Sequence, residues 1–419
     1  MNEDHKFVSL KDFRIMGQQL MASMNKVIFI TINLKNFKYF NQTYGFSAGD
    51  EILEHMKEHF CLQSKSCKLA TFTYIDHLAG LIEEDDIDAD DKLEYIKNVG
   101  MRFVDEINEK YPLAKMHLNC GVYFVEDKTE DIEDIHDKAR YARKSINDTY
   151  NNFIAVYTDE IGKRAVEEAG VIPLFEYALE NNTIELYLQP KFTIDTQKLV
   201  GAEALSRIVD MNGNIVPPGV YIPVLEKSGL ISELDKRMIE LLIQRMKEWK
   251  KKGKKLMTVS INLSRVDFNL PGFIEDIDKK IEEADLPKSA FEFELTETVF
   301  CENLKEIIEK INDMRAKGYK ISMDDFGSGF NSLYVLGMVP IDIIKFDRGF
   351  VLNSLTNKKG FAIMSSLVNT FNSTDFDIIC EGVETREEEQ LVKETGCNVI
   401  QGYLHDKPLP IREFENKYL

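Results

Sequence analysis

The sequence predicts an α/β protein with two domains, an N-terminal α/β domain with a mainly antiparallel sheet followed by a (β/α)8 barrel that resembles a TIM barrel. The 419 residues are enough for two or three well-packed domains. In the first part, strands and helices mix without strict alternation, which favours an antiparallel sheet over a doubly wound one. From residue 165 onward, eight strand-like runs recur, most of them separated by helices, over a length typical of such a barrel.

Composition and charge exclude several classes of protein. Hydrophobic residues make up 44% of the chain and charged residues 29%, as in ordinary globular proteins. The formal charge of −19 argues against non-specific nucleic-acid binding, and the basic run 250–255 reads as a solvated helix end. No apolar run approaches a membrane span, and the first residues lack an apolar signal core. Six cysteines without disulfide or metal-site spacing suggest reduced thiols, so we expect a cytoplasmic protein.

The first domain is expected to span residues 1–158. Alternating and apolar runs predict its strands at 26–34, 69–74, 78–82, 117–125 and 154–157. Amphipathic spacing predicts helices at 48–60, 92–111 and 132–146, and a loop containing Asn41 and Gly45.

The second domain is expected to span residues 159–419, with a linker helix at 159–170 and a second helix ending near 181. Its strands are predicted at 184–189, 199–205, 258–263, 291–295, 320–324, 343–346, 378–381 and 399–402. Helices are predicted between them at 233–251, 304–317, 360–371 and 386–395. In a barrel of this kind the carboxyl ends of the strands form one rim, where active sites occur.

The stretch 319–330 is the most informative part of this domain. An alternating strand ends on two adjacent acids, Asp324 and Asp325, and Gly327 and Gly329 then force a sharp turn. An isolated Asp-Asp pair would most simply be a surface turn. Here, however, the other strand ends also carry polar side chains: Glu203, Asn262, Glu294, Lys345, Glu381 and Gln401.

So many carboxylates at one rim would repel each other unless cations neutralise them. Ligands that are rich in oxygen and contain no histidine point to Mg²⁺ or Mn²⁺ rather than zinc. A carboxylate shared by two ions, such as Asp324, is typical of two-metal hydrolytic sites.

The motifs that carry these residues resemble those of EAL-domain cyclic-di-GMP phosphodiesterases over residues 166–412. The matching segments are Leu188-Gln189-Pro190, Gly201-Ala202-Glu203-Ala204-Leu205-Ser206-Arg207, Ile222-Pro223 with Glu226, Ile261-Asn262-Leu263-Ser264, Glu294-Leu295-Thr296-Glu297-Thr298, Asp324-Asp325-Phe326-Gly327, Ile344-Lys345-Phe346-Asp347, Glu381-Gly382-Val383-Glu384-Thr385 and Gln401-Gly402-Tyr403-Leu404. Departures such as Ser206, Ser328, Phe330 and His405-Asp406 remove no metal ligand.

The resemblance implies roles for individual residues. Glu203, Asn262, Glu294 and Asp324 would bind one Mg²⁺ or Mn²⁺, and Asp324, Asp325 and Glu381 the other. Lys345 would position or deprotonate the attacking water, and Glu203, Asp325 and Glu381 share in catalysis. Gln189, Arg207 and Gln401 would contact the substrate. Glu297 and Glu384 would anchor the Gly-rich loop 326–332, which implies a homodimer through the barrel; either acid could instead lie on the surface without a role. Ca²⁺ is expected to inhibit.

The first domain resembles the GGDEF domain of diguanylate cyclases over residues 26–157, but with catalytic positions changed. The supporting residues are 33–38, 41–50, 120–122 and 137–144. The signature glycines and acids fall on Tyr74-Ile75-Asp76-His77-Leu78, and the metal-binding acids fall on Asn33 and Lys35. Lys65 and Lys68 replace the product-inhibition motif. Cyclase activity is therefore not expected, whereas Asn41 and Asp50 match guanine-contacting positions and leave GTP binding open.

The function that this resemblance implies is hydrolysis of cyclic-di-GMP to linear pGpG, with an inactive GGDEF-like regulatory domain. A receptor that binds cyclic-di-GMP without cleaving it, and so regulates a partner protein, is the alternative from another class. A scaffold that no longer binds nucleotide is a third.

Overall fold

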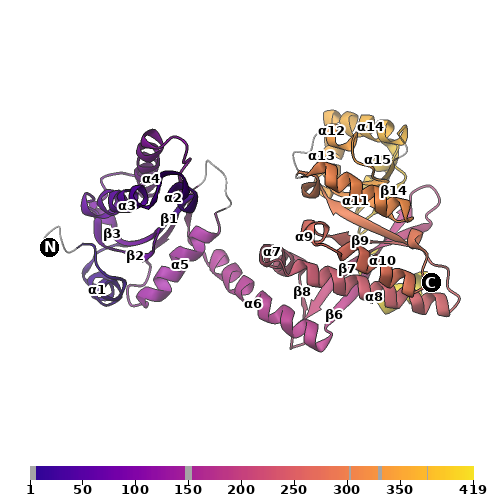
Figure 1. The fold of residues 1–419 in the computed structure, drawn as a ribbon, viewed down its shortest axis with the longest axis horizontal. Helices are drawn as coiled ribbons and strands as arrows, with labels where there is room; N and C mark the ends of the chain where they lie inside the picture. Colours follow the sequence, from indigo (N-terminus) through magenta and orange to yellow (C-terminus); the bar gives the residue numbers. More distant parts are fainter. Residues whose placement is uncertain (1–5, 147–152, 302, 329–332, 375) are drawn as a thin grey trace. The chain divides into compact units, whose positions relative to one another are not determined.

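The computed structural model describes residues 6–146, 153–301, 303–328, 333–374 and 376–419, and the chain divides into two compact units, Met1–Ala169 and Gly170–Leu419 (Figure 1). The division falls within the long helix α6 (Asp159–Asn181). A helix break was predicted near residue 170, but α6 is continuous and contains Pro173.

The first unit is built on a five-stranded sheet in the order β2-β3-β1-β4-β5. Its strands are β1 (Val27–Lys35), β2 (Cys67–Tyr74), β3 (His77–Glu83), β4 (His117–Phe124) and β5 (Ile154–Val156). All neighbours are antiparallel except β4 and β5. The predicted mainly antiparallel sheet is confirmed.

Helices cover both faces of this sheet, because β1 is apolar on both sides. Ile28, Ile30 and Ile32 pack into one core, whereas Val27 and Phe29 pack into a second core with residues of α1 and α5. The helices are α1 (Leu10–Ser23), α2 (Phe37–Tyr44), α3 (Phe46–Lys57), the π-helical turn η2 (Glu58–Leu62), η3 (Glu84–Asp86), α4 (Lys92–Lys110) and α5 (Ile132–Lys144). Asn41 was predicted in a loop, which is wrong: it lies in α2, whose Phe37 and Phe40 are buried.

The second unit is a closed barrel, because β6 (Ile184–Thr193) pairs with β14 (Val399–Gln401) on one side and with β7 (Leu199–Val209) on the other. The ring consists of β6 (Ile184–Thr193), β7 (Leu199–Val209), β9 (Thr258–Leu263), β10 (Phe291–Thr296), β11 (Lys320–Phe326), β12 (Ile343–Phe346), β13 (Asp377–Glu381) and β14 (Val399–Gln401). All eight strands were predicted. Short strands β8 (Ile215–Val216) and β15 (Leu409–Pro410) extend it.

The barrel differs from an all-parallel one at β6, which is antiparallel to both β7 and β14. The connection from Thr193 to Leu199 is too short for the crossover that parallel neighbours need, so the two strands form a hairpin. The other neighbours in the ring are parallel.

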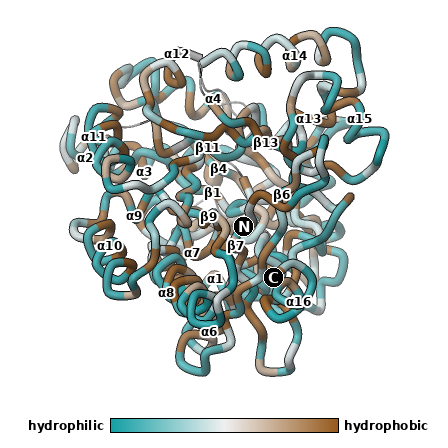
Figure 2. The backbone as a smooth tube through the Cα atoms, turned by 90° about the vertical axis from the view of Figure 1, so that its right-hand side faces the viewer, coloured by the Kyte–Doolittle hydropathy of each residue, from teal (hydrophilic) through white to brown (hydrophobic). Residues whose placement is uncertain are grey.

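Helices around the barrel bury one apolar stripe each. The backbone colours of α8 and α10 alternate between hydrophobic and hydrophilic along the chain (Figure 2), and α10 buries Phe273, Ile277 and Ile281. The helices are α7 (Pro218–Ser228), α8 (Ile231–Lys251), α9 (Arg265–Asn269), α10 (Phe273–Glu283), η4 (Lys288–Ala290), η5 (Glu297–Cys301), α11 (Leu304–Ala316), α12 (Leu333–Leu336), α13 (Arg348–Leu355), α14 (Lys358–Asn372), α15 (Arg386–Glu394) and α16 (Ile411–Tyr418). Of the helices in the described ranges, none is both long and apolar enough to cross a membrane.

Candidate active site at the rim of the barrel

The strand register brings the predicted polar residues to one end of the barrel. Glu294 pairs with Asn262, Glu381 with Gln401, and Gln189 with Glu203. Since side chains alternate between the two faces of a strand, paired residues point to the same side. Most of the rim residues are buried, including Glu203, Glu294, Asp324, Lys345 and Gln401.

Lys345 lies at the centre of four carboxylates. Its Nζ is 2.7 Å from Glu294 Oε2, 2.7 Å from Glu381 Oε1, 3.0 Å from Asp324 Oδ1 and 3.5 Å from Glu203 Oε2. The Lys345 side chain is itself only 1% exposed. The surrounding carboxylates offset the cost of removing this ammonium from water.

Amide side chains hold Glu203 in place. Asn262 Nδ2 donates to Glu203 Oε1 at 3.1 Å, and Gln401 Nε2 donates to Glu203 Oε2. The same Gln401 nitrogen is 3.2 Å from Gln189 Oε1, so the amides link β14, β6 and β7. Both oxygens of Glu203 are thus oriented before any ligand arrives.

Two groups of carboxylates at the rim are compact enough to hold a cation each. Glu203, Glu294 and Asp324 form one group, and Asp324, Asp325 and Glu381 form the other, with ligand atoms within 4.8 Å of one another in each. Asp324 belongs to both groups. This arrangement was predicted from the strand ends.

The backbone at Asp324 and Asp325 explains how two consecutive residues can serve one site. The register between β11 and β12 shifts between Met323 and Phe326, and Asp325 has a left-handed φ of 56°. Consecutive side chains on a regular strand point to opposite faces, but such a bulge can turn the second one toward the same site as the first. A non-glycine residue held there stores strain, which is common at functional sites.

Four of the five rim acids, all except Glu294, resist ionisation, as expected for crowded and buried carboxyl groups. Burial, and then the Glu294 charge, raises the pKa of Glu203 to about 7. Burial raises the pKa of Glu381 to about 8, although the Lys345 ammonium opposes the shift. Burial also raises the pKa values of Asp324 and Asp325. The site therefore has more negative charge than Lys345 neutralises.

The donor set fits hard divalent cations. The ligand atoms of both groups are carboxylate oxygens, as Mg²⁺ and Mn²⁺ prefer. Gln401 Oε1 is buried without a hydrogen-bond partner among the described residues. An added cation would supply positive charge that the raised pKa values indicate is lacking.

Lys191 is a site residue that the sequence did not reveal. Its side chain is 3% exposed, and Nζ lies 3.1 Å from Glu294 Oε1, 3.2 Å from Glu292 Oε1 and 2.8 Å from Ser260 Oγ. Burial alone would raise the pKa of Glu294, but the ammonium groups of Lys345 and Lys191 lower it to about 2. One feature of the sequence could have indicated it. Lys191 comes two residues after Gln189 on the same strand, so the two side chains point to the same side of the strand.

A cavity of about 630 Å³ adjoins the acids, and Arg207 lies in its wall. The Arg207 guanidinium lies 5.3 Å from the Tyr187 ring centroid, and Nη1 donates to the Ser206 carbonyl at 2.7 Å. Asp324, Asp325 and Asn262 line the same cavity. Asp235, which sequence reasoning also missed, is buried there, and burial together with the nearby Asp267 raises its pKa.

The two predicted loop-anchoring acids make different contacts. Glu297 Oε1 accepts a hydrogen bond of 3.0 Å from the backbone N–H of Gly327, just after Asp325. Glu384 instead pairs with Arg348 at 2.7 Å and contacts α13. Residues 329–332 of the Gly-rich loop lie outside the described residues.

In the first unit, Asn33 and His77 stand where the resemblance to cyclases would place acids, whereas Asn41 and Asp50 match its guanine-contacting positions. Asn33 Nδ2 donates to Asp76 Oδ2 at 3.4 Å, and His77 follows at the start of β3. Burial lowers the pKa of His77, as does the nearby Arg143 charge. Asn41 packs closely against Gly49, where a Cβ would lie 2.0 Å from Asn41 Oδ1. Asp50 is exposed on α3.

Comparisons with known proteins assign both units. A family model described as "EAL domain" matches residues 175–408, and one described as "Diguanylate cyclase, GGDEF domain" matches residues 11–152. Signaling protein YkoW of Bacillus subtilis is 27% identical over 96% of this chain and 50% of its own length. The bifunctional diguanylate cyclase/cyclic di-GMP phosphodiesterase MucR of Pseudomonas aeruginosa is 25% identical over 94% of this chain and 58% of its own.

A solved structure supports the assignment of the barrel. The MucR phosphodiesterase in complex with c-di-GMP matches with a TM-score of 0.55 and 28% identity, over 58% of this chain and 99% of that one. The chain spans only about half the length of YkoW and MucR. Because the EAL model covers more than half of the chain and the GGDEF model precedes it, the protein belongs to the EAL-domain family and carries an N-terminal GGDEF domain.

Proposed function

We propose that the barrel hydrolyses cyclic-di-GMP to linear pGpG and requires two divalent cations. The observation that carries this proposal is the pair of carboxylate groups that share Asp324 at the mouth of a barrel cavity. The similarity to the MucR phosphodiesterase, whose structure holds c-di-GMP, supports the choice of substrate.

The residues at the rim would divide the ligands between two Mg²⁺ or Mn²⁺ ions. Glu203, Asn262, Glu294 and Asp324 would hold one ion, and Asp324, Asp325 and Glu381 the other. Bound there, the ions would acidify a water molecule and neutralise phosphodiester oxygens. The carboxylates must be ionised to bind, so cation binding would release protons from Glu203 and Glu381.

Lys345 would act as a fixed positive charge beside the reacting phosphate. Burial alone would lower the pKa of Lys345, but the surrounding carboxylates raise it well above its ordinary value, so the side chain stays an ammonium. An ammonium donates hydrogen bonds and offsets negative charge that develops in the transition state. Positioning of the water, rather than its deprotonation, is thus the role that the geometry supports.

The substrate would be held by side chains in the wall of the cavity and at the rim. Arg207 can donate to a phosphate oxygen or to a guanine edge, and its cation–π contact with Tyr187 would help to position the guanidinium. Gln189 and Gln401 would contribute hydrogen bonds at the rim. These contacts do not depend on the cations.

The test is an assay of the full chain with cyclic-di-GMP in Mg²⁺, Mn²⁺ or Ca²⁺, followed by chromatography of the nucleotides. We expect pGpG in Mg²⁺ or Mn²⁺, and bound but uncleaved substrate in Ca²⁺, whose longer and looser coordination should fail to align the water. Binding without cleavage in every cation would instead favour a non-hydrolysing receptor that regulates a partner protein.

For the N-terminal domain we propose a regulatory role without synthesis of cyclic-di-GMP. An amide at Asn33, an ammonium at Lys35 and an imidazole at His77 replace groups that would hold two cations on a triphosphate. Binding of GTP through Asn41 and Asp50 is a weaker proposal, and calorimetry with millimolar GTP tests it; no heat of binding would refute it.

We also propose a homodimer through the barrel. Glu297 accepts a hydrogen bond from the Gly327 N–H, and Gly327 connects the proposed metal ligands to the Gly-rich loop, which the resemblance associates with the dimer. Sedimentation of the full chain tests this proposal. A monomer with full activity would contradict it.

A further inference from the structure

A third group of potential metal ligands lies in the N-terminal unit, far in sequence from the barrel acids. His55, near the end of α3, and His59, in the π-helical turn η2, are four residues apart, and Glu106 of α4 faces them. Their ligand atoms all lie within 4.8 Å of one another. Two histidines at this spacing on one helical face are a recurrent way of binding zinc.

The separations between these atoms suit a small tetrahedral ion. His55 Nε2 is 2.9 Å from Glu106 Oε2, and His59 Nδ1 is 4.0 Å from the same oxygen. Zinc bound at about 2.0–2.2 Å would place tetrahedral ligands about 3.4 Å apart. The two observed distances bracket that value, so small side-chain rotations would be enough.

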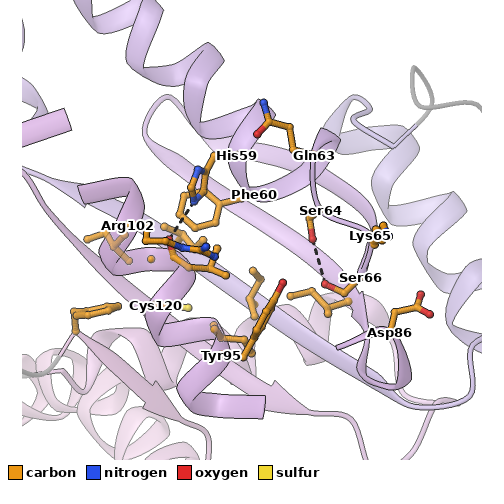
Figure 3. Close-up of a pocket in the computed structure, with 18 of the residues that line it drawn as sticks. His59, Phe60, Gln63, Ser64, Lys65, Ser66, Asp86, Tyr95, Arg102 and Cys120 are labelled. Atoms are coloured by element: carbon orange, nitrogen blue, oxygen red, sulfur yellow. Dashed lines mark hydrogen bonds between the residues drawn. The ribbon is translucent and has the colours of Figure 1, made fainter. Parts of the chain in front are cut away.

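The orientation of the His59 ring favours ligation through Nδ1. His59 Nε2 lies 3.1 Å from the Val99 carbonyl oxygen, so Nε2 carries the proton and donates it (the dashed line at His59 in Figure 3). The lone pair of Nδ1 is then free for a cation. Metal-binding histidines commonly use their second nitrogen in this way.

Packing holds both rings in place without a metal. The Phe103 ring stacks on His55 with centroids 5.3 Å apart and contacts His59 at 5.5 Å. His59 is 14% exposed and His55 38% exposed, so an ion can reach the site from solvent. The π-helical turn that carries His59 is itself a rare conformation that often marks functional sites.

The site opens onto a cavity of about 520 Å³, with His59 and Glu106 in its wall. In Figure 3, His59 and Phe60 lie on one side of this cavity, and Tyr95 and Cys120 lie across from them. Three protein ligands leave a fourth position for water or a small ligand from the cavity. Arg102 also lines the cavity, and its charge would weaken cation binding without removing a ligand.

We infer that His55, His59 and Glu106 form a zinc site in the N-terminal domain, separate from the oxygen-only acids of the barrel. Imidazole ligands select zinc over Mg²⁺. Bound zinc would join the end of α3 and the η2 turn to α4 along one wall of the cavity. Nothing in this inference depends on the proposed phosphodiesterase activity.

The test measures zinc bound by the metal-free full chain in millimolar Mg²⁺, by competition with a chromophoric chelator. The variants are His55→Gln, His59→Gln and Glu106→Gln, and the matched control is Glu109→Gln, an exposed acid on the same helix. We expect the wild type and the control to bind one more equivalent of zinc than the three variants, or to bind it at least about tenfold more tightly.

X-ray absorption at the zinc edge gives an independent readout, because neither group of potential ligands in the barrel contains histidine. We expect imidazole scattering from zinc in the wild type and its loss in His59→Gln. Circular dichroism checks that each variant is folded. Equal zinc binding by all five proteins, or a zinc spectrum without imidazole scattering in the wild type, would overturn the site.

Discussion

Lys345 and the acids around it differ from a simple salt-bridge cluster. One ammonium lies within 3.5 Å of four carboxylates, and the pKa values of Glu203 and Glu381 are raised to about 7 and about 8. A structural ion pair would instead keep its acids fully ionised. The excess of carboxylates agrees with the two cations that we propose for this site.

The first residue-scale prediction separates cleavage from binding at Asp325. Asp325→Asn keeps the shape of the side chain but removes the charge that we propose to bind the second cation. We expect the rate of cyclic-di-GMP hydrolysis to fall on the order of 10³-fold, with binding much less affected because Arg207 and Gln189 remain. Rates and affinities are measured beside Asp313→Asn, an exposed acid on α11. Equal losses in both variants would contradict the assigned role.

The second concerns pH and stability without metal. The pKa values of Glu203 and Glu381 are higher in the folded chain than in the unfolded chain, so folding takes up protons between about pH 4.5 and pH 8. Their contribution to the free energy of unfolding is complete at low pH and is lost as pH rises through about 7 and 8. The melting temperature in EDTA should therefore fall from pH 6 to pH 8.5, and less steeply in Glu381→Gln. An unchanged slope in that variant would argue against this coupling.

At the residue scale, the sequence predicted the polar residues at the rim of the barrel but not the buried Lys191 that contacts them. Strand ends predicted Glu203, Glu294, Asp324 and Lys345 because parallel strands deliver their last inward side chains to one mouth. Lys191 is a buried residue within the antiparallel strand β6, and buried positions inside a barrel are normally apolar. Its contact with Glu292 and Glu294 depends on the register of β6, which the pattern of the sequence does not give.

Among the elements, the β-strands were predicted better than the helices of the N-terminal unit. Helix α1 was not anticipated, although the Ser9 side chain caps it by accepting the Asp12 N–H, which is a sequence-readable signal. For α2, a loop was predicted because Asn41 and Gly45 are turn-forming residues. The spacing of Phe37, Phe40 and Tyr44 is helical, however, and the helix forms because it buries both phenylalanines.

The prediction at this scale concerns the connection after β11. Glu297 at the start of η5 accepts the Gly327 N–H at 3.0 Å, and so fixes the backbone that leaves Asp325. Glu297→Ala removes this acceptor and should lower the hydrolysis rate by about tenfold or more, since a small displacement of catalytic groups is costly. Cation affinity should change much less.

The control is Glu297→Gln, whose amide oxygen can still accept the hydrogen bond and should keep most of the activity. If both substitutions are harmless, the hydrogen bond does not position the site. If both are equally damaging, the charge of Glu297 matters rather than its role as an acceptor.

On the scale of the whole molecule, the chain combines two units with separate hydrophobic cores. The barrel has one continuous core, whereas the N-terminal sheet has one on each face. The periodicity of apolar residues predicted both fold classes, because it shows which side of each helix or strand is buried and each unit buries these sides in its own core. It could not predict the hairpin between β6 and β7, since the pattern of apolar residues in a strand does not show whether the strand is parallel or antiparallel to its neighbour.

The last prediction concerns the role that we propose for the N-terminal unit. The N-terminal unit matches the GGDEF family model, Asn33 donates to Asp76, and His77 lies at the start of β3; the resemblance to cyclases would place acids at Asn33 and His77. We therefore expect no cyclic-di-GMP from GTP. The measurement uses the full chain carrying Glu203→Gln, so that any product would escape breakdown by the barrel, with Mg²⁺ or Mn²⁺ and chromatographic detection. Restoring Asp at Asn33 alone should also give no product, because Lys35 and His77 still replace the other acids. Detectable product from the Glu203→Gln chain would show that this unit binds and activates GTP by ligands other than those of its family.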